Sequence, residues 1–433
     1  MAGQVDSIVS CLTFLIRFAI LNTMKGVIPM HKKLWNKDFI LLLQGNAVSC
    51  IGDLMYSVAI GYWVYQETGS SGLMGIMSAI SMFVSMFLSP FSGSIVDKCN
   101  RKWVMVGVDT LQGVLMLTMG VLAYLDILNV PGVLFVAFLA AFGSVFYSPA
   151  VSTLMIDIIP HEDMVQGQSL HSGIMTLINL VGSAFSGAMV AFFGVPLIVV
   201  INGLSNLYSA VSELFIYVPK TVQQGEPVTV QGILRDSRKA VEMIFSDPCL
   251  KIFIPGVLLL NLLSAGSGSL LLPFCMEKGF AVEAYGYLSA VITAASLAAV
   301  LLMGIVKLSP KIRYWVMTLG FFLAESFIIA TYLSSQFIPM SILAFVAIFL
   351  NSAANAVLSA SLMLALPEEN RGAIIGFIQS ASVGGMALST VIYGLLGDVF
   401  PLYLVFVAGS ALSLLPMLYL CLHRDVKEFV LNN

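Results

Sequence analysis

The sequence predicts an all-α integral membrane protein with twelve transmembrane helices in two six-helix, pseudo-symmetric halves. Its composition is the first reason, because 59% of the 433 residues are apolar, only 10% are charged and the mean hydropathy is +0.97. The second is a set of apolar stretches near the roughly 20 residues that a helix needs to cross a bilayer. The third is the distribution of Lys and Arg, which alternates from one connection to the next. Together these features predict both the number of crossings and their orientation.

The apolar stretches follow one another along most of the chain with short polar connections between them. They lie at 39–65, 73–96, 103–125, 131–156, 165–193, 195–218, 251–275, 284–307, 313–334, 337–363, 372–396 and 401–422. Each is long enough to span the hydrocarbon core as a helix. We therefore predict one transmembrane helix for each stretch.

Nineteen of the 20 Lys and Arg residues fall on one side of this arrangement. They occupy the N-terminal arm, the second, sixth, eighth and tenth loops, and the C-terminal tail. On the other side Lys278 stands alone, close to Glu277 and Glu283. Because basic residues near the ends of spans are retained in the cytoplasm, we predict that both termini and all even-numbered loops are cytoplasmic.

Polar segments divide the chain into five parts. Residues 1–37 are interpreted as a cytoplasmic arm, either lying at the membrane interface or added by an early start codon. Residues 38–218 form the first half and 251–422 the second, with 423–433 as a cytoplasmic tail. Between the halves, 219–250 reads as a cytoplasmic linker, and its apolar residues at helical spacing from Ile233 to Phe245 predict an amphipathic surface helix.

The two halves resemble each other in sequence. Gly75-Ile-Met-Ser-Ala-Ile in the second stretch matches Gly286-Tyr-Leu-Ser-Ala-Val in the eighth, and Arg101-Lys-Trp-Val-Met matches Arg313-Tyr-Trp-Val-Met. The matches keep their order and spacing. Six spans in each half give both repeats the same orientation, which predicts a substrate site between them near the middle of the bilayer.

Composition and motifs exclude several classes of function. A net charge of −3, spread over short loops, gives no reason to expect a nucleic-acid partner. The six cysteines and four histidines form no disulfide or metal-site spacing, and no phosphate-binding loop is present. We therefore expect neither an enzyme nor a cofactor. The expected partners are a small-molecule substrate and the lipid bilayer, with the chain as a monomer.

One loop carries a recognisable motif. Between the second and third stretches the chain reads Gly93-Ser-Ile-Val-Asp97-Lys-Cys-Asn-Arg101-Lys102. This resembles the Gly-x-x-x-Asp-Arg/Lys-x-x-Arg-Arg/Lys signature of the major facilitator superfamily. The resemblance implies the major facilitator fold. It also implies a gating loop, in which Gly93 permits close packing, Asp97 faces the start of the eleventh helix near Gly372, and Arg101 and Lys102 pair with acidic groups across the cytoplasmic seam.

Further stretches resemble the macrolide-efflux and enterobactin-exporter branch of that superfamily. They are Ser49-Cys-Ile-Gly-Asp53, Tyr147-Ser-Pro-Ala, Pro367-Glu-Glu-Asn-Arg-Gly and Gly394-Leu-Leu-Gly-Asp398. Two positions depart from the branch. Val151 replaces a frequent Arg, and Gly182-Ser183 replaces a Gly-Pro that is associated with antiporters, which leaves the direction of transport open.

Ionisable residues inside spans cost about 2.5–3.5 kcal/mol each and usually have a function. Asp53 lies in the middle of the first helix without an evident cation, and burial favours the neutral form of a carboxyl. We therefore predict that Asp53 is the proton-coupling residue and that the proton gradient drives transport. A hydrogen-bonded structural role for Asp53 is the alternative. Glu325 is the second coupling candidate, although anchoring a helix contact is the favoured role for it. Asp109, Glu213 and Asp157 are expected to pair with Arg101, Lys102 or cations of the sixth loop.

Polar residues on the predicted cavity helices are candidates for substrate contact, and interhelical hydrogen bonding is an equal alternative for most of them. Asn46, Ser49 and Tyr56 share a face with Asp53 at spacings i, i+3, i+7 and i+10. The remaining candidates are Asn261, Ser264, Asn351, Asn355 and Gln379. No Lys or Arg lies deep in any predicted span, so neutral or cationic amphiphiles are the expected substrates.

With this resemblance, the observations predict a secondary active transporter of the bacterial inner membrane. It would export amphipathic small molecules, macrolide-like or peptide- and siderophore-like, by alternating access and in exchange for protons. An importer or facilitator of a small nutrient on the same fold is the first alternative. A membrane sensor or scaffold that does not transport is the second.

Overall fold

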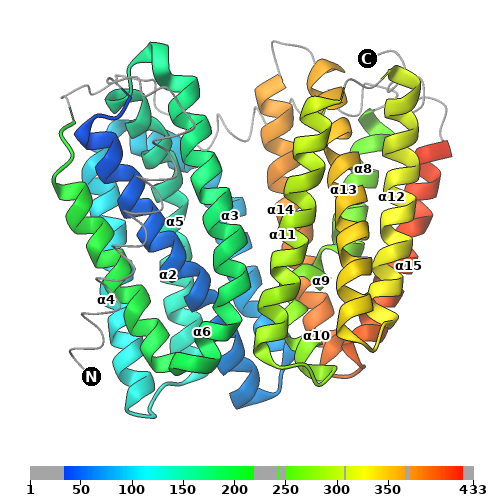
Figure 1. The fold of residues 1–433 in the computed structure, drawn as a ribbon, viewed down its shortest axis with the longest axis horizontal. Helices are drawn as coiled ribbons and strands as arrows, with labels where there is room; N and C mark the ends of the chain where they lie inside the picture. Colours follow the sequence, from blue (N-terminus) through cyan, green and yellow to red (C-terminus); the bar gives the residue numbers. More distant parts are fainter. Residues whose placement is uncertain (1–33, 219–241, 243–249, 307–308, 366–370, 423–433) are drawn as a thin grey trace.

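The computed structural model describes residues 34–218, 242, 250–306, 309–365 and 371–422, and almost all of these residues are helical. Two bundles of helices stand side by side (Figure 1). The first holds α2 (Lys37–Thr68), α3 (Ser71–Lys98), α4 (Arg101–Tyr124), α5 (Val130–Ile158) and α6 (Met164–Leu214). The second holds α8 (Leu250–Ser264), α9 (Gly266–Ser269), α10 (Leu271–Glu277), α11 (Val282–Ile305), α12 (Pro310–Leu333), α13 (Phe337–Ala365), α14 (Arg371–Gly397) and α15 (Leu402–Leu422). The predicted arm at 1–33, most of the linker with its amphipathic helix, and the tail at 423–433 lie outside the described residues.

Local sequence signals set the ends of several helices. The side chains of Asn36, Ser70 and Asn129 each accept a hydrogen bond from the backbone N–H three residues later, at the starts of α2, α3 and α5. Such caps satisfy backbone donors that the first turn of a helix leaves free. Gly69 ends α2 with φ of 63°, a conformation that glycine adopts without steric cost.

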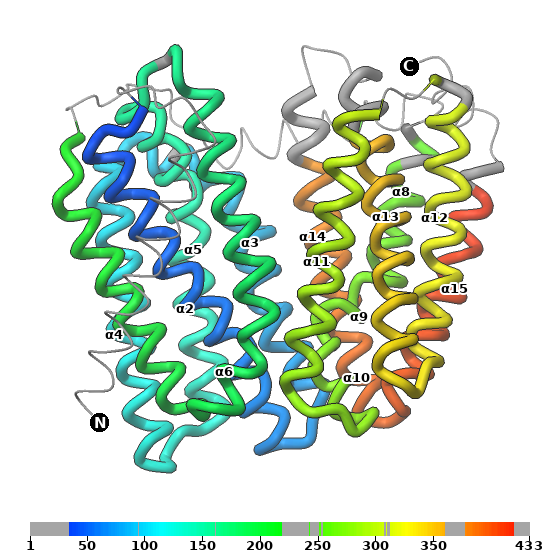
Figure 2. Tube along the Cα trace, viewed as in Figure 1, coloured from blue at the N-terminus to red at the C-terminus, as the bar shows by residue number. Residues whose placement is uncertain are grey.

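The helix α6 is 51 residues long and contains a sharp break at Gly194, which has φ of 72° and ψ of 162° and is followed closely by Pro196. Contacts on either side of the break show that the chain reverses direction there. Before it, α6 runs parallel to α2, with His171 next to Asn46. After it, the chain runs back along α2, with Ser209 next to Gly45. The reversal, which can be followed in Figure 2, confirms the two predicted stretches at 165–193 and 195–218.

The prediction of one continuous seventh helix at 251–275 is wrong. The segment is divided into α8, α9 and α10, and its two parts meet at an angle of 56°. The Gly266 N–H donates to the Ser389 hydroxyl at 2.9 Å, and the Tyr393 hydroxyl donates to the Leu263 carbonyl oxygen. Side chains from α14 therefore satisfy backbone groups that the break leaves free, which a break at this depth requires.

Ten helices in the described part of the chain are long and apolar enough to cross a membrane, and the bent α8–α10 segment supplies one more crossing. Counting α6 as two crossings gives the predicted twelve. The all-α membrane architecture is thus confirmed, with helix ends within a few residues of the predicted ones.

Two apolar clusters form most of the core. One contains residues from both bundles, including Val64 and Met74 from the first and Phe274 and Phe406 from the second. The rings of Phe274 and Phe406 stack with their centroids 5.3 Å apart. The other cluster, around Phe39, belongs to the first bundle alone. The bundles therefore share an apolar core at one end of the molecule.

Candidate functional site

The two bundles meet most closely at one end, which we call the closed end. It comprises residues 70–75 of the first bundle with 390–398 of the second, and residues 183–187 with 282–286. At Gly394, an added Cβ would lie 2.8 Å from the Ser71 carbonyl oxygen. An added Cβ at Gly187 would come even closer to the Val282 carbonyl oxygen. The glycines thus allow the backbone of α3 to contact that of α14, and the backbone of α6 to contact that of α11. The bundles converge at the bottom of Figure 1, where α11 lies beside α6.

A carboxylate joins the bundles at this end. Asp398 accepts hydrogen bonds from the Ser70 hydroxyl at 2.8 Å and from the Gly72 N–H at 3.0 Å. Its charge sits at the start of α3, where free N–H groups and the helix dipole favour an anion. Asp398 therefore caps a helix of the opposite half.

Lys278, the one basic residue predicted on this side, also acts as a helix cap. Its ammonium donates to the carbonyl oxygens of Tyr332, at 2.7 Å, and of Ser334 at the end of α12. Burial lowers the pKa of this amine, and the nearby Cys275 and Glu277 act in the opposite direction. The ammonium group of Lys278 thus caps the C-terminal end of α12.

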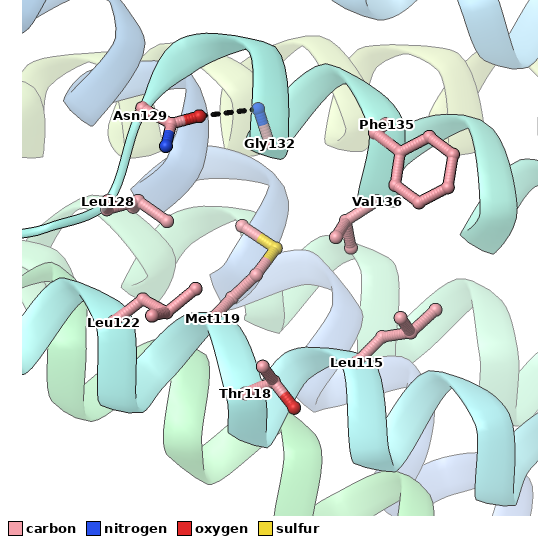
Figure 3. Close-up of a pocket in the computed structure, with 9 residues that line it drawn as sticks. All are labelled: Leu115, Thr118, Met119, Leu122, Leu128, Asn129, Gly132, Phe135 and Val136. Carbon is pink, nitrogen blue, oxygen red and sulfur yellow. Dashed lines mark hydrogen bonds between the residues drawn. The ribbon is translucent and has the colours of Figure 1, made fainter.

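A cavity of about 490 Å³ lies between the bundles. Its lining comes from α3, α8 and α14 and is apolar: Phe83, Met86, Phe87, Leu258, Leu259, Leu262, Ala381, Gly384, Gly385 and Leu388. The Asn261 side chain borders it, because its Cβ lies 3.8 Å from the position of a Cβ on Gly385. The volume falls within the range of sites for drug-sized ligands. Figure 3 shows a smaller pocket of about 150 Å³ between α4 and α5, which lies within one bundle.

The other predicted contact residues of the second half do not gather at this cavity. The Ser264 hydroxyl bonds to the Leu260 carbonyl oxygen of its own helix. Asn355 donates to the side-chain oxygen of Asn351 at 2.8 Å, so these two amides satisfy each other on α13. Gln379 is exposed on α14. Their roles in substrate binding stay predictions.

Asp53 is exposed in the structure, and the Asn206 amide is 3.4 Å from its carboxylate. Asn206 also bonds to Asn202 at 2.9 Å. These two asparagines are buried in a polar seam in which Gly52 of α2 packs against Ser205 of α6. The sequence did not single out the α6 residues, because their partner helix is not evident from spacing alone.

The predicted neighbours of Asp53 on α2 point into the first bundle. Asn46 and Ser49 are buried, and the Tyr56 hydroxyl lies 3.9 Å from the Met119 sulfur. Asn46 accepts a hydrogen bond from the Tyr147 hydroxyl at 2.5 Å, while its amide nitrogen is 3.3 Å from His171 Nε2. Hence Asn46 is part of an internal network rather than of the cavity between α3, α8 and α14.

The loop motif has a different set of contacts from those that the resemblance implied. Arg101 pairs with Asp157 of α5 and lies 3.8 Å from Asp97, so it binds acids of its own half, not acids across the seam. Lys102 donates to the carbonyl oxygens of Leu214 and Ile216, at 2.7 and 2.9 Å. The pairing of Asp157 with Arg101 is confirmed. The resemblance implies contacts of Arg101 and Lys102 across the seam when the halves meet at that end, whereas they meet at the other end in this structure, so these two contacts stay predictions.

Gly93 also differs from expectation, since a Cβ there would meet nothing within 4 Å. The close packing predicted for it is absent because the bundles approach each other at the other end. The side chains around Gly372 lie outside the described part of the chain, so the contact of Asp97 with the start of α14 stays a prediction.

The remaining buried acids lie away from the cavity. Glu325 of α12 is buried beside Ser410 and Ser413 of α15, which agrees with a helix-anchoring position. Asp109 and Glu213 are buried beside Tyr147 in the first bundle. No Lys or Arg of the described residues forms an ion pair with either of these two acids. Most cations of the sixth loop lie outside the described residues, so pairing with them stays a prediction.

Comparison with known proteins agrees with this architecture. A family profile described as Major Facilitator Superfamily matches residues 42–324. Macrolide efflux protein A of Streptococcus pyogenes is 22% identical over 186 residues, which are 43% of this chain and 46% of that protein. The match thus spans less than half the length of that relative.

Solved structures share the fold across nearly the whole chain. A bacterial homologue of the human lysosomal transporter Spinster, inward-facing and unoccupied, has a TM-score of 0.65 at 14% identity, covering 94% of this chain and 97% of that one. The nucleoside transporter NupG has a TM-score of 0.69 at 12% identity, covering 88% and 98%. At these identities the similarity establishes the fold.

Proposed function

Because the chain belongs to the major facilitator superfamily, a superfamily of membrane transporters, we propose that it exports amphipathic small molecules in exchange for protons. The apolar cavity between the two halves carries this proposal, because such a site suits a drug-sized apolar ligand. Macrolide efflux protein A, one of its relatives, supports the class of substrate. No Lys or Arg lines the cavity, which disfavours anionic substrates.

We place the protein in a bacterial inner membrane with both termini cytoplasmic. The support is the position of 19 of the 20 Lys and Arg residues on one side of the twelve crossings. In this orientation the closed end faces outward, and the structure corresponds to an inward-facing state. Export by alternating access then requires the closed end to open, with separation of α3 from α14 and of α6 from α11.

Asp53 is the proposed proton carrier of the export cycle. It is exposed, and it is held by Asn206 of α6, so its carboxyl can exchange a proton without unfolding its surroundings. A proton taken up from outside would neutralise Asp53. The same proton would then be released on the cytoplasmic side. Glu325 is the second candidate, and its buried position against α15 makes it the less accessible of the two.

The test is efflux from a bacterium that lacks its own exporters. Cells carrying the wild-type chain, Asp53→Asn, Glu325→Gln or Glu67→Gln would be loaded with macrolides and fluorescent cationic amphiphiles, with and without a protonophore. Glu67 is an exposed acid on the same helix as Asp53 and serves as the matched control. We expect protonophore-sensitive efflux with the wild type and Glu67→Gln, and its loss with Asp53→Asn.

Other outcomes would change the proposal in defined ways. Efflux that survives Asp53→Asn but not Glu325→Gln would move coupling to α12. Absence of efflux for every compound would refute the proposed substrate class.

An importer of a small neutral nutrient is the second candidate function. The observation that favours it is Gly182-Ser183 in place of the Gly-Pro that is associated with antiporters. Accumulation that depends on external nutrient, in the same strains, would identify that activity. For either transporter we expect a monomer that needs no cofactor other than the proton gradient.

A further inference from the structure

Three ionisable side chains of the first half converge inside it, away from the cavity between the halves. Asp109 of α4 and Glu213 of α6 are 3% and 1% exposed, and Tyr147 of α5 faces the carboxyls of both. One carboxyl oxygen of each acid is buried without a hydrogen-bond partner. The Ser209 hydroxyl lies beside Asp109 and Tyr147, is completely buried, and also lacks a partner of good geometry.

No positive charge compensates these acids within the described residues. Arg101 pairs with Asp157, and Lys102 donates to the carbonyl oxygens of Leu214 and Ile216 at the end of α6. Glu213 is the penultimate residue of α6, where the helix dipole disfavours an anion. Asp53 adds a further negative charge near Asp109. Two carboxylates in such a place cannot both be ionised without a large cost.

The hydrogen bonds of Tyr147 also indicate that the two carboxyls are not both ionised, because the contacts outnumber the available protons. The Tyr147 oxygen lies 2.5 Å from the Asn46 side-chain oxygen and 2.8 Å from a Glu213 oxygen. In the structure Asn46 presents its oxygen to Tyr147 and its nitrogen to His171, which accepts as the tautomer with an unprotonated Nε2. A tyrosine has one hydroxyl proton and can donate to only one of these acceptors. With the Asn46 oxygen toward Tyr147, as in the structure, both contacts are hydrogen bonds only if Glu213 carries a proton and donates it to Tyr147.

We propose that Asp109, Tyr147 and Glu213 form a proton-binding site in which the two carboxyls hold one proton between them. With the proton present, Glu213 donates a hydrogen bond to the Tyr147 oxygen, and the Tyr147 hydroxyl donates to Asn46. When the proton leaves, the Tyr147 hydroxyl turns to the Glu213 carboxylate and its bond to Asn46 breaks. Since Asn46 belongs to α2, the change alters the contact of α5 and α6 with the helix that carries Asp53.

The route for the proton is provided by partly exposed groups at the edge of the cluster. Tyr147 and His171 are both partly exposed, and His171 contacts Asn46. The titratable groups that face the cluster are therefore Asp53 from α2, Asp109 from α4, Tyr147 from α5, and His171 and Glu213 from α6. Only the use of this proton in transport rests on the proposed export function; its binding does not.

The first test measures protonation without any substrate. Infrared spectra of the purified full-length protein in lipid nanodiscs would be titrated with acid and base, and the band of protonated carboxyl groups compared among variants. Asp109→Asn and Glu213→Gln preserve side-chain size, and Glu67→Gln is the control. We expect the wild type to keep a protonated-carboxyl band at neutral pH, and Glu213→Gln or Asp109→Asn to remove part of it.

Two results would refute the site. In one, neither variant changes the band while both remain folded, which would show that both carboxyls are ionised. In the other, sodium ions abolish the band at constant pH, which would show that the pair binds a metal cation instead. Tyr147→Phe should leave the band present but shift its position, because the hydrogen bond to Glu213 is lost.

The second test concerns coupling. In proteoliposomes with a pH gradient and an exported amphiphile, Glu213→Gln should lower gradient-driven efflux by about tenfold, within the usual range for coupled sites. Exchange of labelled for unlabelled substrate at equal pH should persist. Unchanged gradient-driven efflux in both Asp109→Asn and Glu213→Gln would exclude the site from transport. If the wild type exports nothing, the export proposal fails, while the infrared experiment still decides whether the proton is bound.

Discussion

Gly75 and Gly286 occupy equivalent positions in the two halves, and each brings its helix against the backbone of the other half. A Cβ at Gly75 would lie 2.7 Å from the Thr390 carbonyl oxygen, and one at Gly286 would lie 3.0 Å from those of Ser183 and Ala184. Both begin the same sequence match between the halves. The same repeated sequence element, once in α3 and once in α11, therefore packs against the opposite half at the closed end.

This relationship predicts that Gly75→Leu opens the closed end. An inserted side chain has no room against Thr390, and overpacking of this kind costs about 1–3 kcal/mol. Spin labels at Glu67 and Gln336, exposed residues of opposite halves at this end, would report the change by pulsed electron resonance. We expect a shift to longer distances. Gly107→Leu is the control, since a Cβ at Gly107 meets nothing within 4 Å, and an equal shift there would contradict the explanation.

Asp398→Ala should also weaken the contact between the two halves at the closed end, by removing a helix cap. It removes the acceptor for the Ser70 hydroxyl and the Gly72 N–H, and loss of a helix cap costs about 0.5–2 kcal/mol. The same label pair should show a larger open population, and Asp398→Asn, which keeps one acceptor oxygen, should show a smaller increase. Identical distance distributions in all three proteins would mean that the cap does not hold the halves together.

Breaking the pair of Arg101 and Asp157 should destabilise the first half. Their side chains are only 9% and 15% exposed, and removing one partner of a buried ion pair costs about 3–5 kcal/mol. Thermal unfolding in detergent should show a large loss of stability for Arg101→Ala and a small one for Lys98→Ala, an exposed cation of the same loop. The double variant with Asp157→Ala should lose less than the sum of the two single variants. Strict additivity would show that the two charges do not interact.

Filling the cavity between the halves should change substrate selection. Ala381→Phe places a ring among the residues of α3, α8 and α14, so bulky amphiphiles should lose about tenfold in affinity, roughly 1.4 kcal/mol, while the smallest compounds lose less. Thr118→Phe fills the smaller pocket within the first bundle and serves as the control (Figure 3). Efflux would be measured as a function of compound size. Equal effects of the two variants on all compounds would exclude the cavity as the substrate site.

Much of the fold could be predicted from hydropathy and charge, because a bilayer requires long apolar helices and orients them by their basic flanks. The break in the seventh crossing was missed, although Gly266 and Gly268 in a Gly-Ser run were a visible signal. Which helices are neighbours could not be predicted from spacing. For this reason Tyr147 and His171 were not recognised as partners of Asn46. Two of the cations expected near Asp109 and Glu213, which are Arg101 and Lys102, contact other groups in the structure.

Lys278 has a consequence for the order in which the chain is made. Its ammonium group is bound by carbonyl oxygens of Tyr332 and Ser334, residues more than 50 positions later in the sequence. In the proposed orientation Lys278 lies on the outer side, so its ammonium group reaches these acceptors only once α12 has crossed the membrane. The adjacent Glu277, which later caps α15 through the Leu402 N–H, is the nearest opposite charge until then. The contacts of Lys278 therefore depend on two later helices, α11 and α12, being in place.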